Sequence, residues 1–299
     1  MRRSAKVIGA VATAFIIGWI LYRYGGEAPA VDWSNSNVWR NLAGAVALYV
    51  VVQLVAARVW KLLVVSFGVN PKGWTAESQF LTAQIGKYLP GNFAHLAGRI
   101  ALAIKDGAPA APVGLALVAE TALTVAAGLA VAAAGLWLLP ELGAKLNAAL
   151  PAGEDFAVTA ALLAAVLIAV IAGALTLKRY GLLEPLARLG LRNLLVVVLI
   201  QSAAFGLLGG SLHLVAGISA PDSAPPLLLC VVVFAVAWVA GLITPGAPGG
   251  LGVRESIITL GLGTVIGAPA ALTAALLHRA VSVAGDVIAF AIGCALRGR

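Results

Sequence analysis

The sequence predicts an all-α membrane protein with several spans, and three observations support this fold class. Of the 299 residues, 61% are hydrophobic and 11% are charged, whereas a soluble globular chain has about 25% charged residues. Apolar runs of about 20 residues, long enough to cross a bilayer as helices, recur along the chain. The alternation of apolar and polar residues that a membrane β-barrel requires does not repeat.

Several segments are candidates for membrane-spanning helices because each is apolar over roughly the thickness of a bilayer. They are residues 7–22, 42–65, 113–139, 156–177, 194–218, 227–243 and 270–296. Two further segments, 75–105 and 244–266, are interrupted by Pro and Gly, which predicts broken or re-entrant helices. We expect about seven or eight crossings, with eight if 253–266 crosses the membrane.

We predict a single integral membrane domain over residues 1–299. No polar stretch is long enough for a soluble domain of even ~50 residues, which argues against a soluble catalytic domain. An internal repeat would divide the chain into halves at about 42–177 and 194–296. The net charge of +8 is explained by anionic lipids and the positive-inside bias, so we expect no nucleic acid as a partner.

Loop charges predict a plasma-membrane protein with a cytoplasmic N-terminus, because cytoplasmic loops carry the excess of Lys and Arg. The cations lie before the first span, around the end of the second, and in the loop between the fourth and fifth: Arg2, Arg3, Lys6, Arg58, Lys61, Lys72, Lys178, Arg179, Arg188 and Arg192. Carboxylates follow the first, third and fifth spans: Glu27, Asp32, Glu141, Glu154, Asp155 and Asp222.

The stretch 244–255, TPGAPGGLGVRE, cannot form a straight helix because it contains two prolines and four glycines. Irregular backbone exposed to lipid leaves polar groups unsatisfied, so this stretch belongs at an interface or inside protein. Inside protein it supplies the backbone N–H groups of Gly249 and Gly250, a helix N-terminus, and the Arg254 cation beside Glu255. These features suit an anion. A plain connecting loop is the alternative.

An earlier stretch, 84–99, has a similar pattern. Pro90 precedes Arg99 by nine residues, as Pro245 precedes Arg254, and a Gly-Ala-Pro tripeptide follows each stretch, at 107–109 and 267–269. Paired, interrupted hydrophobic segments in two halves of a chain indicate a transporter's binding site. The polar residues of the earlier stretch join the candidate site: Lys87, Tyr88, Asn92 and His95.

Ionisable residues also lie within predicted spans. A charge at the centre of a membrane helix costs about 2.5–3.5 kcal/mol even on the lenient insertion scale. Glu120 lies in the third span, and Arg279 and Asp286 share one face of the last span. We expect these groups to face the bundle interior, either lining a polar cavity or forming a buried ion pair that fixes helix packing. His278 lies near the end of its span and is expected at the interface or in the site.

Two motifs, PGGLGVRE at 248–255 and GKYLPGNFAHLAGR at 86–99, resemble the lysylphosphatidylglycerol synthase transmembrane-region family. That family includes the flippase-like membrane domain of multiple-peptide-resistance proteins and small stand-alone relatives. The resemblance runs from the first span to the last. It implies an α-helical bundle with broken helices and a lipid-translocating role in the cell envelope. In two-part relatives a soluble aminoacyl-transfer domain follows. This chain ends at Arg299, so aminoacyl-lipid synthesis is not expected.

The predicted function is lipid transport: flippase-like movement of an anionic or polyprenyl-phosphate-linked lipid across the cytoplasmic membrane. Arg99 and Arg254 would hold the phosphate-bearing headgroup, because a guanidinium group donates two hydrogen bonds at once. The alternatives are a non-transporting subunit that presents a lipid carrier to a separate glycosyltransferase or synthase, a small-solute transporter, and an intramembrane enzyme. We expect no enzyme activity, because no nucleophile–base pattern is present.

The candidate substrate-binding residues are Lys87, Tyr88, Asn92, His95, Arg99, Glu120, Gly249, Gly250, Arg254, Glu255, Arg279 and Asp286. No spacing of Cys and His residues indicates a metal site, and no motif indicates a cofactor. Besides the lipid, we expect a second copy of the chain or a partner lipid-modifying enzyme as protein partner.

Overall fold

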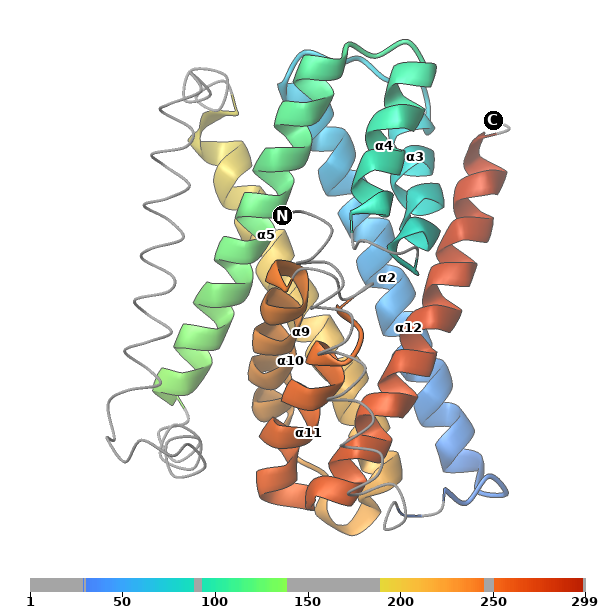
Figure 1. Cartoon of the computed structure of the whole chain (residues 1–299), viewed down its shortest axis with the longest axis vertical. Coiled ribbons are helices and arrows are strands. Elements are labelled where there is room, and N and C mark those ends of the chain that lie inside the picture. Colours follow the sequence, from blue (N-terminus) through green and yellow to red (C-terminus); the bar gives the residue numbers. More distant parts are fainter. Residues whose placement is uncertain (1–28, 30, 89–92, 139–188, 245–249, 298–299) are drawn as a thin grey trace, which may run out of the picture. The chain divides into compact units, whose positions relative to one another are not determined.

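The computed structural model describes residues 29–138 and 189–297, apart from residues 30, 89–92 and 245–249. Within these ranges the chain contains eight α-helices, two short 3-10 helices and no strand (Figure 1). The predicted all-α fold is therefore confirmed. The predicted spans 7–22 and 156–177, the dipeptides Pro90-Gly91 and Pro245-Gly246, Asn92 and Gly249 lie outside the described residues.

Among the described residues, four helices are long and apolar enough to cross a membrane: α2 (Ser36–Ser66), α5 (Ala110–Leu138), α9 (Gly190–Ser219) and α12 (Ala268–Arg297). Their 29 to 31 residues correspond to about 45 Å, more than the hydrocarbon core of about 30 Å. They confirm the predicted spans 42–65, 113–139, 194–218 and 270–296, and the chain is a multi-pass membrane protein.

Shorter helices occupy the two segments that the sequence predicts to be broken, 75–105 and 244–266, and also the predicted span 227–243. α3 (Thr75–Ala83) continues into the 3-10 helix η2 (Gln84–Tyr88) and is followed by α4 (Ala94–Lys105). After the 3-10 turn η3 (Pro221–Ser223), α10 (Leu227–Ile243) is followed by α11 (Val253–Ile266). At 9 to 17 residues, these α-helices rise only about 14–26 Å, less than a bilayer core. The eighth crossing at 253–266 stays a prediction.

The order of elements repeats along the described chain: a long helix, two short ones, and another long one (Figure 1). In both copies the Gly-Ala-Pro tripeptide forms the corner between the second short helix and the following long helix. Gly107 has a φ of 88° and Gly267 a φ of 78°, a backbone conformation that glycine adopts far more readily than other residues. This backbone conformation explains why both tripeptides begin with glycine.

The chain packs into two compact units, each built from segments distant in sequence. The first unit comprises Met1–Val52, Ile85–His95 and Phe205–Ile288, and the second unit comprises Gln53–Gln84, Leu96–Ala204 and Ala289–Arg299. Helices α2, α9 and α12 contribute to both units. The halves 42–177 and 194–296 stay a prediction.

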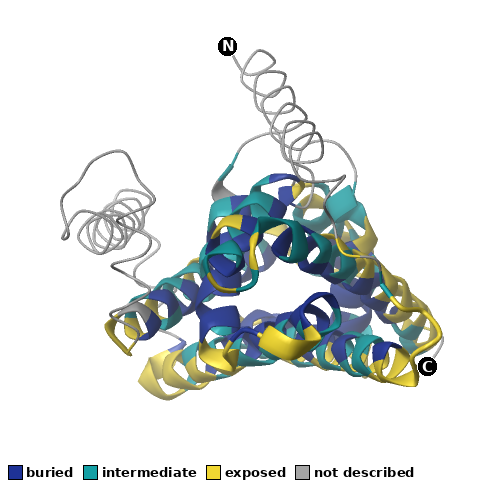
Figure 2. Ribbon diagram, turned by 90° about the horizontal axis from the view of Figure 1, so that it is seen from below, coloured by how far each residue is buried: buried dark blue, intermediate teal, exposed yellow. Residues whose placement is uncertain are grey.

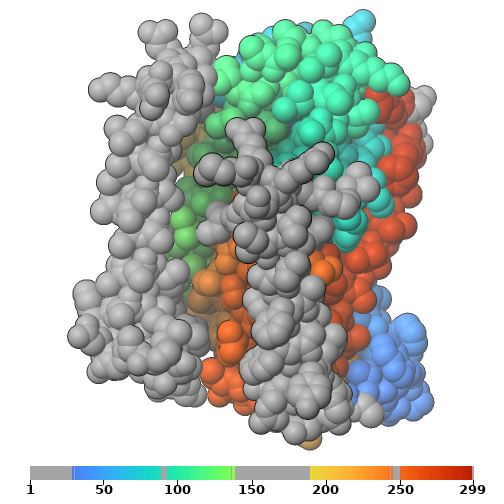
Figure 3. Space-filling view, in the orientation of Figure 1, coloured from blue at the N-terminus to red at the C-terminus, as the bar shows by residue number. Residues whose placement is uncertain are grey.

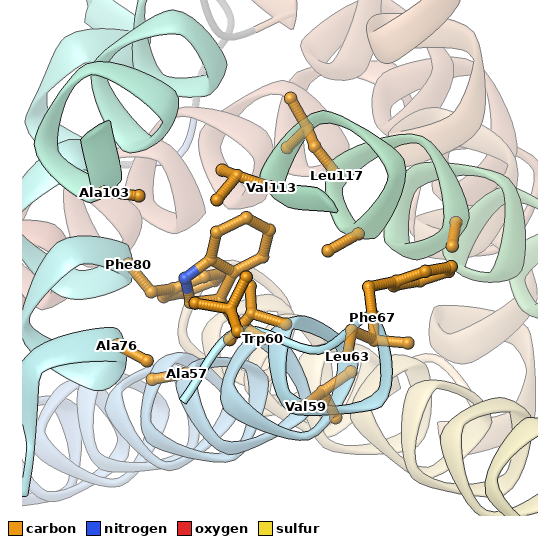
Figure 4. Close-up of a cluster of buried hydrophobic side chains, with 14 of the residues drawn as sticks. Ala57, Val59, Trp60, Leu63, Phe67, Ala76, Phe80, Ala103, Val113 and Leu117 are labelled. Atoms are coloured by element: carbon orange, nitrogen blue, oxygen red, sulfur yellow. The ribbon is translucent and has the colours of Figure 1, made fainter. Parts of the chain in front are cut away.

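The core of the second unit forms around Trp60 of α2, whose indole is fully buried (Figure 4). Phe80 of α3, Ala103 of α4 and Val113 of α5 belong to the same cluster. Ala103 is small enough to let its helix approach the neighbouring one closely, which is how membrane helices pack.

The end of α12 lies against α3 in the second unit (Figures 1 and 3). The Ser78 hydroxyl donates a 2.9 Å hydrogen bond to the Gly293 carbonyl oxygen. A Cβ at Gly293 would lie 2.8 Å from the side chain of Leu81. The glycine therefore permits this helix contact.

The long helices are buried along one face only (Figure 2). On α9, Val197 is fully buried whereas Leu199 is 68% exposed, and on α12 Ala289 is fully buried whereas Val287 is 52% exposed. Large apolar side chains exposed in this number suit contact with lipid tails rather than water.

In the first unit, α9 and α10 are in backbone contact at Gly209. A Cβ at this position would overlap the backbone of Val231 on α10. Nearby, the rings of Phe205 and Trp238 meet edge to face with centroids 5.5 Å apart. Gly206, on the same helix, has nothing within 4 Å of where a Cβ would lie.

We predict that Gly209→Ala lowers the thermal unfolding temperature of the purified protein in detergent, because overpacking of a close contact costs about 1–3 kcal/mol. Gly206→Ala is the matched control and should leave the unfolding temperature unchanged or higher, because Ala favours a helix over Gly. Equal unfolding temperatures for the two variants would contradict the α9–α10 contact.

Candidate functional site

The first unit contains a cluster of polar side chains around Asp286, which is completely buried on α12. Lys87 of η2 donates to this carboxylate at 2.7 Å. Tyr49 of α2 donates to it at 3.1 Å, and the Tyr88 hydroxyl of η2 also donates to it. The carboxylate is thus paired with a cation and held by two phenols, as a buried charge requires.

The absence of a side chain at Gly285 lets Tyr49 reach this position. A Cβ at Gly285, the residue before Asp286, would lie only 3.1 Å from Cε1 of the Tyr49 ring and closer still to Cδ1. The ring therefore packs directly on the α12 backbone. Lys87 Nζ donates a 2.9 Å hydrogen bond to the Tyr49 hydroxyl and lies 5.5 Å from the centre of its ring.

Glu255, on the first turn of α11, has two partners. Its Oε2 accepts a 2.6 Å hydrogen bond from the Gly252 N–H, which satisfies one of the open donors at the helix start. Its Oε1 lies 3.5 Å from the guanidinium group of Arg279 on α12. That guanidinium group lies 5.6 Å from the centre of the Tyr88 ring.

These contacts connect the two broken segments inside the first unit. Lys87 and Tyr88 come from the first segment, and Glu255 comes from the second. Arg279 and Asp286 of α12 lie between them in the chain of contacts. We call these five residues with Tyr49 the polar network.

Arg254 differs from the residues of the polar network, because no carboxylate pairs with it among the described residues. Its Nε is buried and has no hydrogen-bond partner there. The side chain lies between two glycines: a Cβ at Gly241 of α10 would come within 3.0 Å of Nε, and one at Gly250 within 2.8 Å. The guanidinium carbon lies 5.9 Å from the centre of the Trp238 ring.

Arg254 lies close enough to four residues of the polar network for their electrostatic fields to act on it: Tyr49, Arg279, Glu255 and Asp286. Arg254 is therefore a cation beside the polar network but outside its ion pairs. An unpaired guanidinium group in this setting can hold a ligand anion through two parallel hydrogen bonds.

Arg99 lies in the second unit and is paired. It donates to the Glu120 carboxylate of α5, and both side chains are buried. The rings of Trp60 and Phe80 each lie 4.6 Å from its guanidinium carbon. These contacts satisfy the charge without a ligand and favour a packing role. Phosphate binding by Arg99 stays a prediction.

A hydrogen bond extends this pair toward α9. The Glu120 carbonyl oxygen accepts from Thr124 Oγ1 at 2.8 Å, and that hydroxyl accepts from Gln201 at 2.6 Å. Arg99, Glu120, Thr124 and Gln201 are thus linked to one another across α4, α5 and α9.

The second unit also has a cavity of about 420 Å³ where the α2–α3 and α4–α5 connections meet. Asp106 lines it, and its two carboxylate oxygens accept from Gln79 at 2.8 Å and Arg297 at 3.0 Å. Because this carboxylate is satisfied within the chain, we do not include the cavity in the candidate site.

Of the residues predicted from the sequence, the structure brings these together in the first unit: Lys87, Tyr88, Gly250, Arg254, Glu255, Arg279 and Asp286. His95 also belongs to this unit, at the start of α4, where a Cβ at Gly86 would lie 3.0 Å from its backbone nitrogen. Arg99 and Glu120 belong to the second unit.

Sequence reasoning missed Tyr49, Trp238, Gly241 and Gly285. Tyr49 and Trp238 are single aromatic residues within apolar helices, and nothing in their spacing marks them. Gly241 and Gly285 carry a weak signal, because small residues inside membrane helices often mark close contacts. Their partners become visible only when α2, α10, α11 and α12 are placed together.

The described residues contain no group of three or more His, Cys, Asp or Glu side chains that could hold a metal ion. The arrangement is one of ion pairs, phenols and a single guanidinium group outside those pairs. Its chemistry suits the binding of an anion.

A protein-family model described as "Lysylphosphatidylglycerol synthase TM region" matches residues 6–289. The match covers nearly the whole chain, including both broken segments and the polar network. No curated protein matches the chain.

We predict that Arg99→Leu destabilises the protein by about 3–5 kcal/mol, because it leaves Glu120 buried without its partner. The double variant Arg99→Leu/Glu120→Leu should recover most of the stability, since it removes both charges. Thermal unfolding in detergent measures both effects. If the double variant is as unstable as Arg99→Leu, the loss of stability does not come from an unpaired Glu120, and the prediction is wrong.

Proposed function

The chain belongs to the lysylphosphatidylglycerol synthase TM region family, and from this premise we propose that it is a lipid transporter. It moves an anionic or polyprenyl-phosphate-linked lipid across the cytoplasmic membrane, with the phosphate of the headgroup held by Arg254. We propose that the N-terminus lies in the cytoplasm, as the loop charges predict. The family is one of lipid-related membrane proteins.

The single observation that carries the proposal is the state of Arg254. Lys87 is paired with Asp286, Arg279 with Glu255, and Arg99 with Glu120. Among the residues that the structure describes, Arg254 has no such carboxylate, and its Nε has no acceptor. A charge left unpaired at membrane depth costs at least about 2.5–3.5 kcal/mol. A mobile anion would remove this cost whenever it occupies the site.

The same physics acts on the lipid. Its acyl or prenyl chains stay in the hydrocarbon, and only its phosphate opposes passage. When the phosphate is bound to Arg254, its charge and that of the guanidinium group neutralise each other. The phosphate therefore does not pass through the membrane as an isolated charge. The fork of the guanidinium group matches two phosphate oxygens, which is why arginine suits this role better than lysine.

The polar network supports this role without binding the phosphate itself. Glu255 holds the start of α11 through the Gly252 N–H and holds Arg279 through its second oxygen. The residue next to Arg254 is thus fixed to both α11 and α12. We propose a transporter rather than an enzyme, because these groups pair with one another instead of presenting a nucleophile next to a base.

We predict that Arg254→Gln slows lipid movement at least about tenfold, because a hydrogen bond to a charged group contributes about 1.5–3 kcal/mol. The assay uses proteoliposomes with fluorescent phosphatidylglycerol or a short-chain polyprenyl phosphate, and dithionite quenches the label outside. Arg40→Gln is the matched control, because Arg40 is exposed near the start of α2.

Equal rates for wild type and Arg254→Gln would overturn the assignment of Arg254. A purified wild type that binds either probe but moves neither would favour the alternative function, a subunit that presents a lipid to a separate enzyme.

We further predict that Gly241→Ala reduces transport, although the variant keeps Arg254 itself unchanged. Its new methyl group would come within 2.9 Å of Arg254 Cγ and force the side chain to move. The nearest backbone atom, the Cα of Gly250, would lie 3.2 Å from this methyl group, a looser contact than the overlap at Gly209, so the unfolding temperature should fall less than in Gly209→Ala. Gly206→Ala, the same change where nothing is near, should keep the wild-type rate. Full activity of Gly241→Ala would contradict the close fit around Arg254.

A further inference from the structure

A second buried polar atom without a partner lies in the first unit. His278 on α12 is 4% exposed, and its Nε2 has no hydrogen-bond partner in the described part of the chain. Leaving such an atom unsatisfied costs about 1–3 kcal/mol. The sequence places this histidine near the end of a span, where water could satisfy it, but the structure buries the ring.

His278 faces the same side of α10 as Arg254. Its ring meets Phe234 edge to face, with centroids 5.1 Å apart. Phe234 and Trp238 are one turn apart on α10 and so share a face. Trp238 is the ring beside Arg254. The charged groups that act on the imidazole are those of Arg254 and Arg279.

The charges around Arg254 indicate how much negative charge a ligand should bring. Lys87, Arg254 and Arg279 are cations, whereas Glu255 and Asp286 are carboxylates. One negative charge therefore balances this set. A phosphodiester carries one negative charge, so it fits better than a doubly charged phosphate ester.

We propose that His278 is a specificity-determining residue of this site, and that its Nε2 hydrogen-bonds to a hydroxyl group on a phosphodiester headgroup held by Arg254. The proposal rests on the proposed function and adds the chemistry of the rest of the headgroup. A ring nitrogen donates or accepts according to its tautomer, and a hydroxyl group does both, so the two match in either tautomer. An ammonium headgroup matches poorly, because it would lie beside two guanidinium groups.

The test compares two soluble lipids that differ only in headgroup hydroxyl groups. Dihexanoyl phosphatidylglycerol and dihexanoyl phosphatidylmethanol are both singly charged phosphodiesters. Their dissociation constants are measured by titration calorimetry on the purified full chain in nanodiscs. We expect wild type to bind the glycerol lipid about tenfold more tightly, because binding of the methanol lipid leaves Nε2 unsatisfied.

The variants separate the two roles. His278→Leu should bind both lipids alike, and His278→Gln, whose amide can also donate and accept, should keep part of the preference. His278→Phe repeats the test if the leucine variant does not fold. Arg254→Gln should weaken the binding of both lipids by a similar factor, so the ratio of their dissociation constants should stay the same.

Several results would overturn the inference. One is a wild type that does not distinguish the two lipids. Another is a His278→Leu variant that still prefers the glycerol lipid. Both leave phosphate binding intact if Arg254→Gln weakens both lipids. If Arg254→Gln binds both lipids as well as wild type does, the proposed phosphate site itself is wrong.

Discussion

The buried carboxylate of Asp286 is the interaction on which the first unit depends. It lies where no water can solvate it, so it needs a cation and hydrogen-bond donors from the protein. Lys87 supplies the cation, and Tyr49 and Tyr88 supply the donors. These partners come from α2 and η2, so satisfying one charge fixes the positions of three elements. The neighbouring cations, Lys87 and Arg279, each pair with a carboxylate, whereas Arg254 pairs with none in the described part of the chain.

Glycines decide how closely the charged groups approach the helices. Gly285 lets the Tyr49 ring lie on the α12 backbone, and Gly241 with Gly250 leaves room for the Arg254 side chain. In a membrane there is little hydrophobic force between helices, so close van der Waals contact and polar bonds must hold them. The glycines therefore serve both the packing of the first unit and the geometry of its candidate site.

The repeat explains why Arg99 and Arg254 look equivalent in sequence but not in structure. Counted from the Pro-Gly dipeptides, they occupy the same position. Counted from the helix starts, Arg99 lies in the second turn of α4 and Arg254 in the first turn of α11. Arg99 thus meets Glu120 and two aromatic rings, whereas Arg254 lies beside the irregular backbone at Gly250. Two similar motifs can therefore have different roles.

The sequence alone determined the membrane class, the all-α fold, the four long spans and both broken segments, because hydrophobic length and Pro-Gly interruptions are local properties. It also identified all four charged side chains of the polar network, since charges inside apolar runs and beside Pro-Gly interruptions are conspicuous. Only the tertiary structure decided which charges pair, because pairing depends on helices that are far apart in sequence. The roles of Tyr49, Trp238 and His278 also follow only from the tertiary structure. Packing brings Tyr49 to Asp286 and Trp238 to Arg254, and it buries His278 with its Nε2 unsatisfied.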